Sequence, residues 1–311
     1  MPRPPLGAHV SIAGGLPLAF ERAAALDCEA IQIFVKNASQ WQGRRLDDAE
    51  VVAFRAARRE SKIGAVIAHA SYLINLAARE RTVRRRSIRG LADELGRCDR
   101  LGVDALVVHP GAHLGAGVER GVERAGDAVA EARERAGAGR TRLLLENTAG
   151  QGTLLGRTLE ELAAIRGRAD LGARVGVCID TCHAFAAGHP IDEAGGWRLF
   201  LERLEDTLGR AAIGALHLND SQAPRGSCRD RHANLGAGLV GIAAFRRIVV
   251  DPRLRDVPMI VETPLGADQR GHARDLDVLR RLRAKRALRD RDERRGVPGC
   301  SGRRVTPGAG S

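Results

Sequence analysis

Short apolar runs alternate along the chain with longer segments in which apolar residues recur every three or four positions. The runs are almost continuously apolar, which is typical of strands covered on both faces in a parallel sheet. They lie at residues 6–10, 30–35, 65–69, 105–109, 142–146, 175–180, 213–218 and 258–262. The longer segments have helical periodicity. They lie at residues 16–27, 47–61, 81–102, 118–137, 158–167, 197–209, 241–250 and 273–290.

Eight strands alternating with eight helices over ~280 residues predict an α/β fold, a single-domain (β/α)8 TIM barrel. A doubly wound open sheet is the alternative. Five of the eight apolar runs end on a His, Asp or Glu, and a sixth, at 213–218, has His217 one residue before its end. Those side chains can converge only if the strand ends circle a common axis, so they favour the barrel. The predicted active site therefore lies at the C-terminal face of the strands, where TIM barrels carry their chemistry.

The composition changes near residue 281. We expect residues 1–280 to form the barrel and residues 281–311 to form a basic tail. The tail is first rich in arginine and then in glycine, proline and serine. Such a composition cannot bury a core, so the end of the tail is expected to be disordered.

The formal net charge of +12 comes almost entirely from arginine, because Lys36, Lys62 and Lys285 are the only lysines. A basic total favours a polyanionic partner such as nucleic acid. An arginine-biased genome explains the same excess equally well. No apolar run approaches the ~20 residues of a membrane span, and no secretory signal is visible. The six cysteines form no CxxC pair, which indicates reduced thiols in a cytoplasmic protein.

Nine residues have the side chains that zinc and manganese prefer. They are His69, His109, Glu146, Asp180, His183, His217, Asp230, His232 and Glu262. A single histidine is usually structural, but the histidines at 69, 109 and 217 each follow at least three apolar residues. The repetition at six strand ends indicates a face that gathers metal ligands.

Two short motifs add to these strand ends. In DTCH, Asp180 and His183 lie three residues apart, so both can face one way if the chain turns helical after the strand. In DRH, Asp230 and His232 alternate by one, so an extended backbone sends both to one face. Nine ligands can hold three metals. Two metals ~3.5–4 Å apart can activate water and support an in-line displacement, and a third can neutralise phosphate oxygens. The set therefore favours phosphodiester hydrolysis.

In long and specific stretches the chain resembles the endonuclease IV family of abasic-site DNA repair enzymes. These stretches include GAHVSIAGG (7–15), HASYLINLA (69–77), LLENTAGQG (144–152), GVCIDTCHAFAAG (176–188) and DRHANLGAG (230–238). The resemblance extends to residue 264. It implies a hydrolase that cuts the phosphodiester 5′ to an abasic site in double-stranded DNA and leaves a 3′-hydroxyl. It also implies trimming of blocked 3′ ends.

The resemblance further implies three zinc ions. Carried over by position, His69, His109 and Glu146 resemble ligands of the first ion. Glu146, Asp180, His217 and Glu262 resemble ligands of the second, with Glu146 bridging. His183, Asp230 and His232 resemble ligands of the third. By the same resemblance, Glu262 and Glu146 are the catalytic carboxylates, and Glu262 orients or deprotonates the attacking water.

DNA contacts in this family come from loops at the strand C-termini. Here the matching positions are Asn37, Gln40, Tyr72, Leu73 and Arg231. Tyr72, the only tyrosine, could act with Leu73 as a wedge that fills the gap left by a flipped-out nucleotide. The alternative is that Tyr72 packs on the barrel rim. Some family members have an arginine at the position of Ser39, so damage sensing here is expected to depend more on the wedge.

Two other functions fit part of the pattern. A sugar isomerase or epimerase on the same barrel would use the glutamates at 146 and 262, Asp180 and His217, and would leave the other five ligand-type residues unexplained. A DNA-binding module that has lost catalysis is the second alternative, although all nine positions hold competent residue types. One barrel can carry the whole site, so a monomer without membrane contact is expected.

Overall fold

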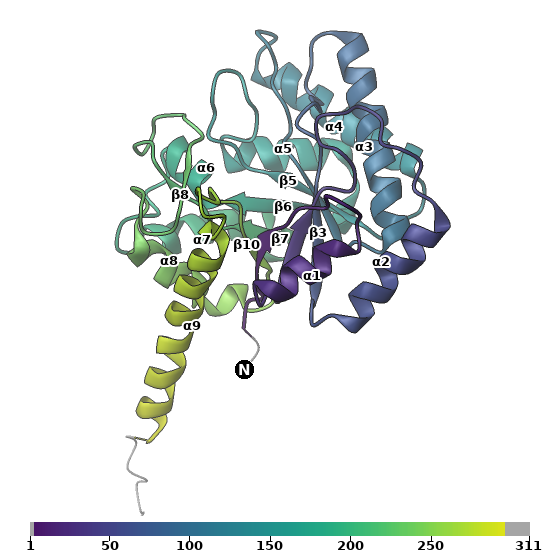
Figure 1. The fold of residues 1–311 in the computed structure, drawn as a ribbon. Helices are drawn as coiled ribbons and strands as arrows, with labels where there is room; N and C mark the ends of the chain where they lie inside the picture. The colour runs from purple at the N-terminus through teal and green to yellow at the C-terminus, as the bar shows by residue number, and fades with distance from the viewer. Residues whose placement is uncertain (1–2, 296–311) are drawn as a thin grey trace, which may run out of the picture.

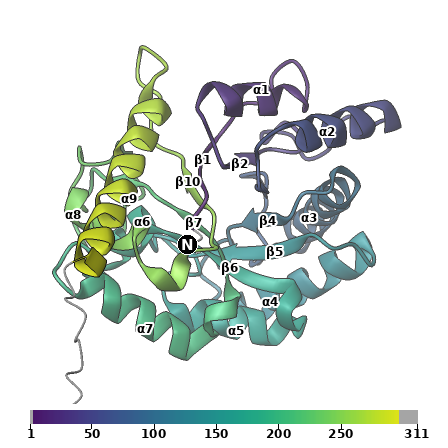
Figure 2. The same ribbon diagram turned by 90° about the horizontal axis from the view of Figure 1, so that it is seen from below.

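The computed structural model describes residues 3–295 of the chain, and its strands close into a parallel barrel (Figures 1 and 2). The spatial order is β1-β10-β7-β6-β5-β4-β3-β2, with β1 pairing with both β2 and β10. The strands are β1 (Leu6–His9), β2 (Ala30–Ile33), β3 (Ala65–His69), β4 (Ala105–Val108), β5 (Arg142–Glu146), β6 (Val175–Asp180), β7 (Ile213–His217) and β10 (Met259–Val261). The predicted (β/α)8 barrel is confirmed, and the open sheet is excluded.

Helices surround the barrel on the outside, as the view in Figure 2 shows. They are α1 (Leu18–Ala25), α2 (Asp48–Glu60), α3 (Arg81–Leu101), α4 (Val118–Ala136), α5 (Leu159–Ala169), α6 (Thr181–Ala187), α7 (Gly196–Leu208), α8 (Ile242–Val249) and α9 (Gly271–Arg295). Short 3-10 turns precede β6, β7 and β10 at Gly172–Arg174, Arg210–Ala212 and Pro252–Leu254. Each of the eight predicted helical segments corresponds to one of these helices.

Sequence periodicity did not find two small elements, α6 and a two-stranded hairpin of β8 (Asp220–Ser221) and β9 (His232–Ala233). Both elements are too short for a helical or strand-like repeat of apolar residues to be recognised in the sequence. The helical turn that the DTCH motif requires is present, because Asp180 caps α6 by accepting a hydrogen bond from the His183 N–H at 2.8 Å. The hairpin carries the DRH motif.

The interior of the barrel is filled by apolar side chains from alternate positions of the strands. One buried cluster occupies the centre: Ala30, Ile67, Ala105, Val107, Leu144, Cys178, Ala215 and Ile260. A second and larger cluster lies between the strands and the helices and includes Phe54, Leu91 and Phe245. Because both faces of each strand are buried, the strands are continuously apolar in sequence.

Helix α9 packs on the barrel beyond the expected boundary at residue 280. Leu282 is buried, and Arg283 bonds to the Pro4 carbonyl and forms an ion pair with Glu29. Pro4 and Glu29 precede β1 and β2, so α9 ends at the face opposite the strand C-termini (Figure 1). The predicted disorder of the final residues lies outside the described part of the chain. Among the described helices, none is long and apolar enough to cross a membrane.

Candidate metal centre

The candidate ligands form one layer at the C-terminal end of the barrel interior. Side chains two residues apart on a strand share a face. Each strand-end ligand follows an interior apolar residue by two positions: His69 follows Ile67, and Glu146 follows Leu144. The other four such positions are His109, Asp180, His217 and Glu262. The six ligands therefore point to the barrel axis for the same reason that the core residues below them do.

The first group consists of His69, His109 and Glu146, whose ligand atoms all lie within 4.8 Å of one another. Nε2 of His69 is 3.1 Å and Nε2 of His109 is 2.9 Å from Oε2 of Glu146. Nδ1 of His69 contacts the Ala70 carbonyl at 2.8 Å. That contact orients the ring so that Nε2 is the nitrogen facing the group.

The second group consists of Glu146, Asp180, His217 and Glu262. Nδ1 of His217 lies 2.8 Å from Oε1 of Glu146 and 3.0 Å from Oε2 of Glu262. The two oxygens of Glu146 thus face different groups, Oε2 the first and Oε1 the second. Glu146 is fully buried and is placed to be shared by two cations.

The third group consists of His183, Asp230 and His232. The Asp230 oxygens lie 3.1 Å from Nε2 of His183 and 3.1 Å from Nε2 of His232. Cys182 lies near Asp180 and His232, but burial raises the pKa of its thiol to about 12. Because a thiolate is the form that binds metal, the imidazole and carboxylate set is the better match.

The centre gathers four carboxylates, and their negative charge favours the binding of cations. Within the described residues, the carboxylates of Glu146, Asp180, Asp230 and Glu262 form ion pairs with histidines and with no lysine or arginine. Burial opposes protonation of the imidazoles, yet the surrounding carboxylates raise the pKa of His183 to about 10 and of His232 to about 9. Removing charge from water is costly unless it is compensated. Bound cations would provide that compensation, so the residues fit a metal cluster.

The same environment shifts the pKa values of the carboxyl groups in the centre. Burial alone would raise the pKa of Glu146 and Glu262, but the surrounding histidines, His217 first, outweigh burial and hold both pKa values well below the usual range. For Asp230, burial is outweighed by hydrogen bonds from His183 and His232, and its pKa is also lowered. These carboxylates remain ionised at neutral pH, as metal ligands must.

A buried amide that the sequence analysis did not single out supports this layer. Gln32 is fully buried at the end of β2, and its Oε1 lies 2.8 Å from Nε2 of His217. Its Nε2 donates to Oε1 of Glu262 at 2.5 Å and lies 3.1 Å from Nδ1 of His9. Gln32 follows interior Ala30 by two positions, so the periodicity that places the ligands could have found it.

Two asparagines hold the ligands that follow β6. The side chain of Asn147 accepts from the Asp180 N–H at 2.7 Å, and the Asn219 amide donates to Oδ2 of Asp180 at 2.6 Å. Nδ1 of His183 lies 2.9 Å from the Asn147 carbonyl. Partners of this kind fix the orientation of metal-binding side chains.

The ligand layer forms the floor of a cavity of about 410 Å³. Tyr72 lies at the rim of this cavity and is 71% exposed. Its ring packs edge-on against the ring of Phe34, with the two ring centroids 5.5 Å apart. Leu73 is half-buried beside it. The aromatic ring therefore packs on the rim and also faces solvent over the metal centre.

The remaining predicted DNA contacts are exposed on two loops. Asn37 and Gln40 lie between β2 and α2, and Arg231 lies next to Asp230. Arg231 and Arg229 line a second cavity of about 690 Å³. Asn37 and Gln40 line another cavity, of about 470 Å³, and the contact of all three residues with DNA stays a prediction.

Comparison with known proteins agrees with the barrel fold. Residues 20–282 match the family described as xylose isomerase-like TIM barrel. A "probable endonuclease 4" of Chloroflexus aurantiacus is 44% identical over 282 residues, covering 91% of this chain and 98% of that protein. One of Halorhodospira halophila is 46% identical over 278 residues, covering 89% and 93%. The crystal structure of endonuclease IV from Thermus thermophilus superimposes with a TM-score of 0.81 at 40% identity, covering 91% and 100%.

The fold and the site together define a xylose isomerase-like barrel with a metal-ligand layer at its C-terminal face. Within that class, the chain belongs to the endonuclease IV family, whose members are metal-dependent nucleases. A D-tagatose 3-epimerase-like protein superimposes with a TM-score of 0.66 at 20% identity, which reflects the shared barrel alone.

Proposed function

We propose that the protein is a zinc-dependent DNA-repair endonuclease that hydrolyses the phosphodiester 5′ to an abasic site and leaves a 3′-hydroxyl. Trimming of blocked 3′ ends would use the same chemistry, since both reactions break the bond between phosphorus and a 3′ oxygen and leave a 3′-hydroxyl. All nine candidate ligands belong to one chain, so the site needs no second copy. This supports action as a monomer on double-stranded DNA.

One observation carries the proposal: nine ligand residues form three groups, two of which share Glu146. Imidazole and carboxylate ligands in sets of three or four suit zinc. Three cations sharing one site would neutralise the charge of a phosphodiester in its transition state, activate water and support the leaving oxygen. The reaction of a neutral substrate would not develop the negative charge that three cations stabilise.

Individual side chains would have separate roles in this reaction. Glu262, with its Oε1 held by Gln32, presents a carboxylate to the cavity and would accept the proton of the attacking water. Glu146 keeps the first two groups at a fixed separation. His183, Asp230 and His232 would hold the cation that faces the phosphate oxygens. Water would be the attacking group, so no nucleophilic side chain of the protein is needed, and bound cations would stabilise the negative charge on the departing 3′ oxygen.

Recognition of the damaged site would come from the rim. Tyr72 and Leu73 would enter the duplex at the abasic nucleotide, where the missing base lowers the cost of unstacking. Asn37, Gln40 and Arg231 would contact phosphate and sugar, which position the duplex without reading its sequence.

A sugar isomerase on the same barrel is the second candidate. Glu146, Asp180, His217 and Glu262 form a group that would suit it. That function gives no role to the group of His183, Asp230 and His232. The nuclease uses all nine residues and is preferred.

The test is cleavage of a duplex with a single abasic site, before and after metal is removed with a chelator. We expect one cut on the 5′ side of the site, lost on chelation and restored by zinc, with three zinc ions per chain by metal analysis. Protein loaded with zinc that leaves abasic DNA intact would contradict the proposal, and sugar substrates would be tested next.

A further inference from the structure

A buried ion pair lies outside the metal centre and joins the two loops that carry the rim residues. Nζ of Lys36 is 3.0 Å from Oε1 of Glu94, and their side chains are 3% and 1% exposed. Lys36 opens the loop between β2 and α2, and Glu94 lies in the middle of α3. Removing one partner of a buried ion pair is strongly destabilising, because it leaves the other charge buried and uncompensated.

The Glu94 carboxylate also receives the loop after β3. The Ser71 N–H donates to both Glu94 oxygens, at 3.3 and 3.2 Å. Ser71 is the residue immediately before the Tyr72–Leu73 wedge, and its hydroxyl accepts from the Leu73 N–H at 3.3 Å. The backbone of the wedge is therefore fixed from below by one acid on α3.

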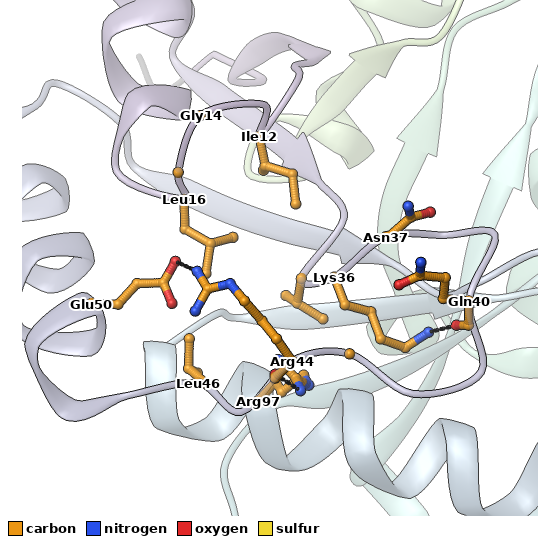
Figure 3. Close-up of a pocket in the computed structure, with 13 residues that line it drawn as sticks. Ile12, Gly14, Leu16, Lys36, Asn37, Gln40, Arg44, Leu46, Glu50 and Arg97 are labelled. Atoms are coloured by element: carbon orange, nitrogen blue, oxygen red, sulfur yellow. Dashed lines mark hydrogen bonds and ion pairs between the residues drawn. The ribbon is translucent and has the colours of Figure 1, made fainter.

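The ammonium of Lys36 continues the chain of contacts to the other loop. It donates to the Gln40 carbonyl at 2.6 Å, and Figure 3 shows its side chain extending to Gln40 inside the loop. The Ser71 hydroxyl donates to the Ala38 carbonyl and connects the two loops directly. We call Lys36, Ser71 and Glu94 the Glu94 bridge.

We propose that the Glu94 bridge is a positioning device for damage recognition: it sets the distance between the Asn37–Gln40 loop and the Tyr72–Leu73 wedge. The inference rests on the proposed function, because it assumes that both loops contact DNA. None of the three residues is a candidate metal ligand. A glutamine at position 94 can still accept from the Ser71 N–H, so the Ala70–Ser71 peptide, whose carbonyl orients His69, should stay in place. The effect should therefore fall on the binding of the duplex and leave the metal centre as it is.

Energetically, the bridge is sensitive to removal of one partner. Glu94→Gln keeps the shape of the side chain but leaves the Lys36 ammonium buried without a counter-charge. The loop from Lys36 to Gln40 would then move so that the ammonium reaches water. A misplacement of ~1 Å can cost ~100-fold in rate even when it arises far from the chemistry.

The experiment compares wild type, Glu94→Gln and the double variant Lys36→Met with Glu94→Gln. The double variant buries no unpaired charge, so it should fold, yet methionine cannot hold the Gln40 carbonyl. We expect kcat/KM for an abasic duplex to fall ~10- to 100-fold in both variants, mainly through KM. Zinc content should stay unchanged, as should hydrolysis of bis(p-nitrophenyl) phosphate, a small phosphodiester that needs the metal centre alone.

Asp99→Asn is the matched control. Asp99 lies on the same helix five residues further on, accepts from the Thr141 N–H at 2.7 Å and faces Arg133, away from the rim loops. It should leave KM for the abasic duplex unchanged. A folded double variant with wild-type KM would overturn the inference, as would parallel losses with the small phosphodiester. Failure of the wild type to cut abasic DNA would instead count against the proposed function.

Discussion

The layer of candidate metal ligands and the loops proposed to recognise DNA are built on different principles. The floor is regular: each strand-end ligand points inward because it lies two residues beyond an interior core residue. The rim consists of loops, and its order depends on contacts between loops such as the Glu94 bridge. Strand geometry places the six strand-end ligands, whereas the third ligand group and the recognition loops depend on short turns and on a few buried polar side chains outside the strands.

The largest effect is expected from the floor, at the carboxylate shared by two groups. Glu146→Gln replaces a bridging carboxylate with an amide, which is a poor bridging ligand. Loss of several kcal/mol of transition-state stabilisation corresponds to a fall of about 10³-fold or more in kcat/KM. Metal analysis should show lost zinc in parallel. Full zinc occupancy with wild-type cleavage would remove Glu146 from the centre.

A smaller effect on the same floor is expected from Gln32. Gln32→Leu keeps the volume but removes the bonds to His217 and Glu262. Loss of such outer partners costs about 10- to 100-fold in metal affinity. Competition with a chelator measures this directly, and zinc retained as tightly as in wild type would contradict the role. Gln40→Leu, on an exposed loop, is the control and should keep wild-type zinc affinity.

Substitutions at the rim should weaken DNA binding and leave zinc binding unchanged, the reverse of what is expected for Gln32→Leu. Tyr72→Ala should weaken binding to abasic DNA, because stacking on an aromatic side chain contributes ~1–3 kcal/mol, or roughly 5- to 150-fold. Zinc content should not change. Binding titrations with abasic and intact duplexes give the measurement, and a preference for abasic DNA that equals that of wild type would argue against a wedge.

The tail should have the smallest effect. Helix α9 ends at the face opposite the metal centre, and its described hydrogen bonds with the barrel reach Arg283. Deleting residues 285–311 removes basic side chains while keeping those bonds. For every phosphate that the tail neutralises, its deletion should reduce the salt slope of DNA binding by ~0.9, with the cut position unchanged. An unaltered slope would make the tail irrelevant to DNA.

The two regions also differ in how far sequence alone could predict them. The barrel and the clustering of the six strand-end ligands follow from apolar runs that lead to ligands, because parallel strands in a closed barrel leave one inward direction for each alternate residue. The other three, His183, Asp230 and His232, were indicated by the spacing in the DTCH and DRH motifs. Gln32 followed the same rule and was missed because glutamine is not a typical ligand. Glu94 could not be found, since it lies mid-helix and its partners are 58 and 23 residues away in the chain.

The closed barrel has a consequence for how the protein is made. Glu262 follows β10, the last barrel strand, and β10 pairs with β1, the first. The centre therefore lacks a candidate ligand until nearly the whole barrel has been synthesised and its two ends have met. A nascent chain on the ribosome, or one clipped before β10, would carry eight of the nine candidate ligands and lack Glu262. Under the proposed function we expect such a chain not to cut DNA, so the topology would delay nuclease activity until folding is complete.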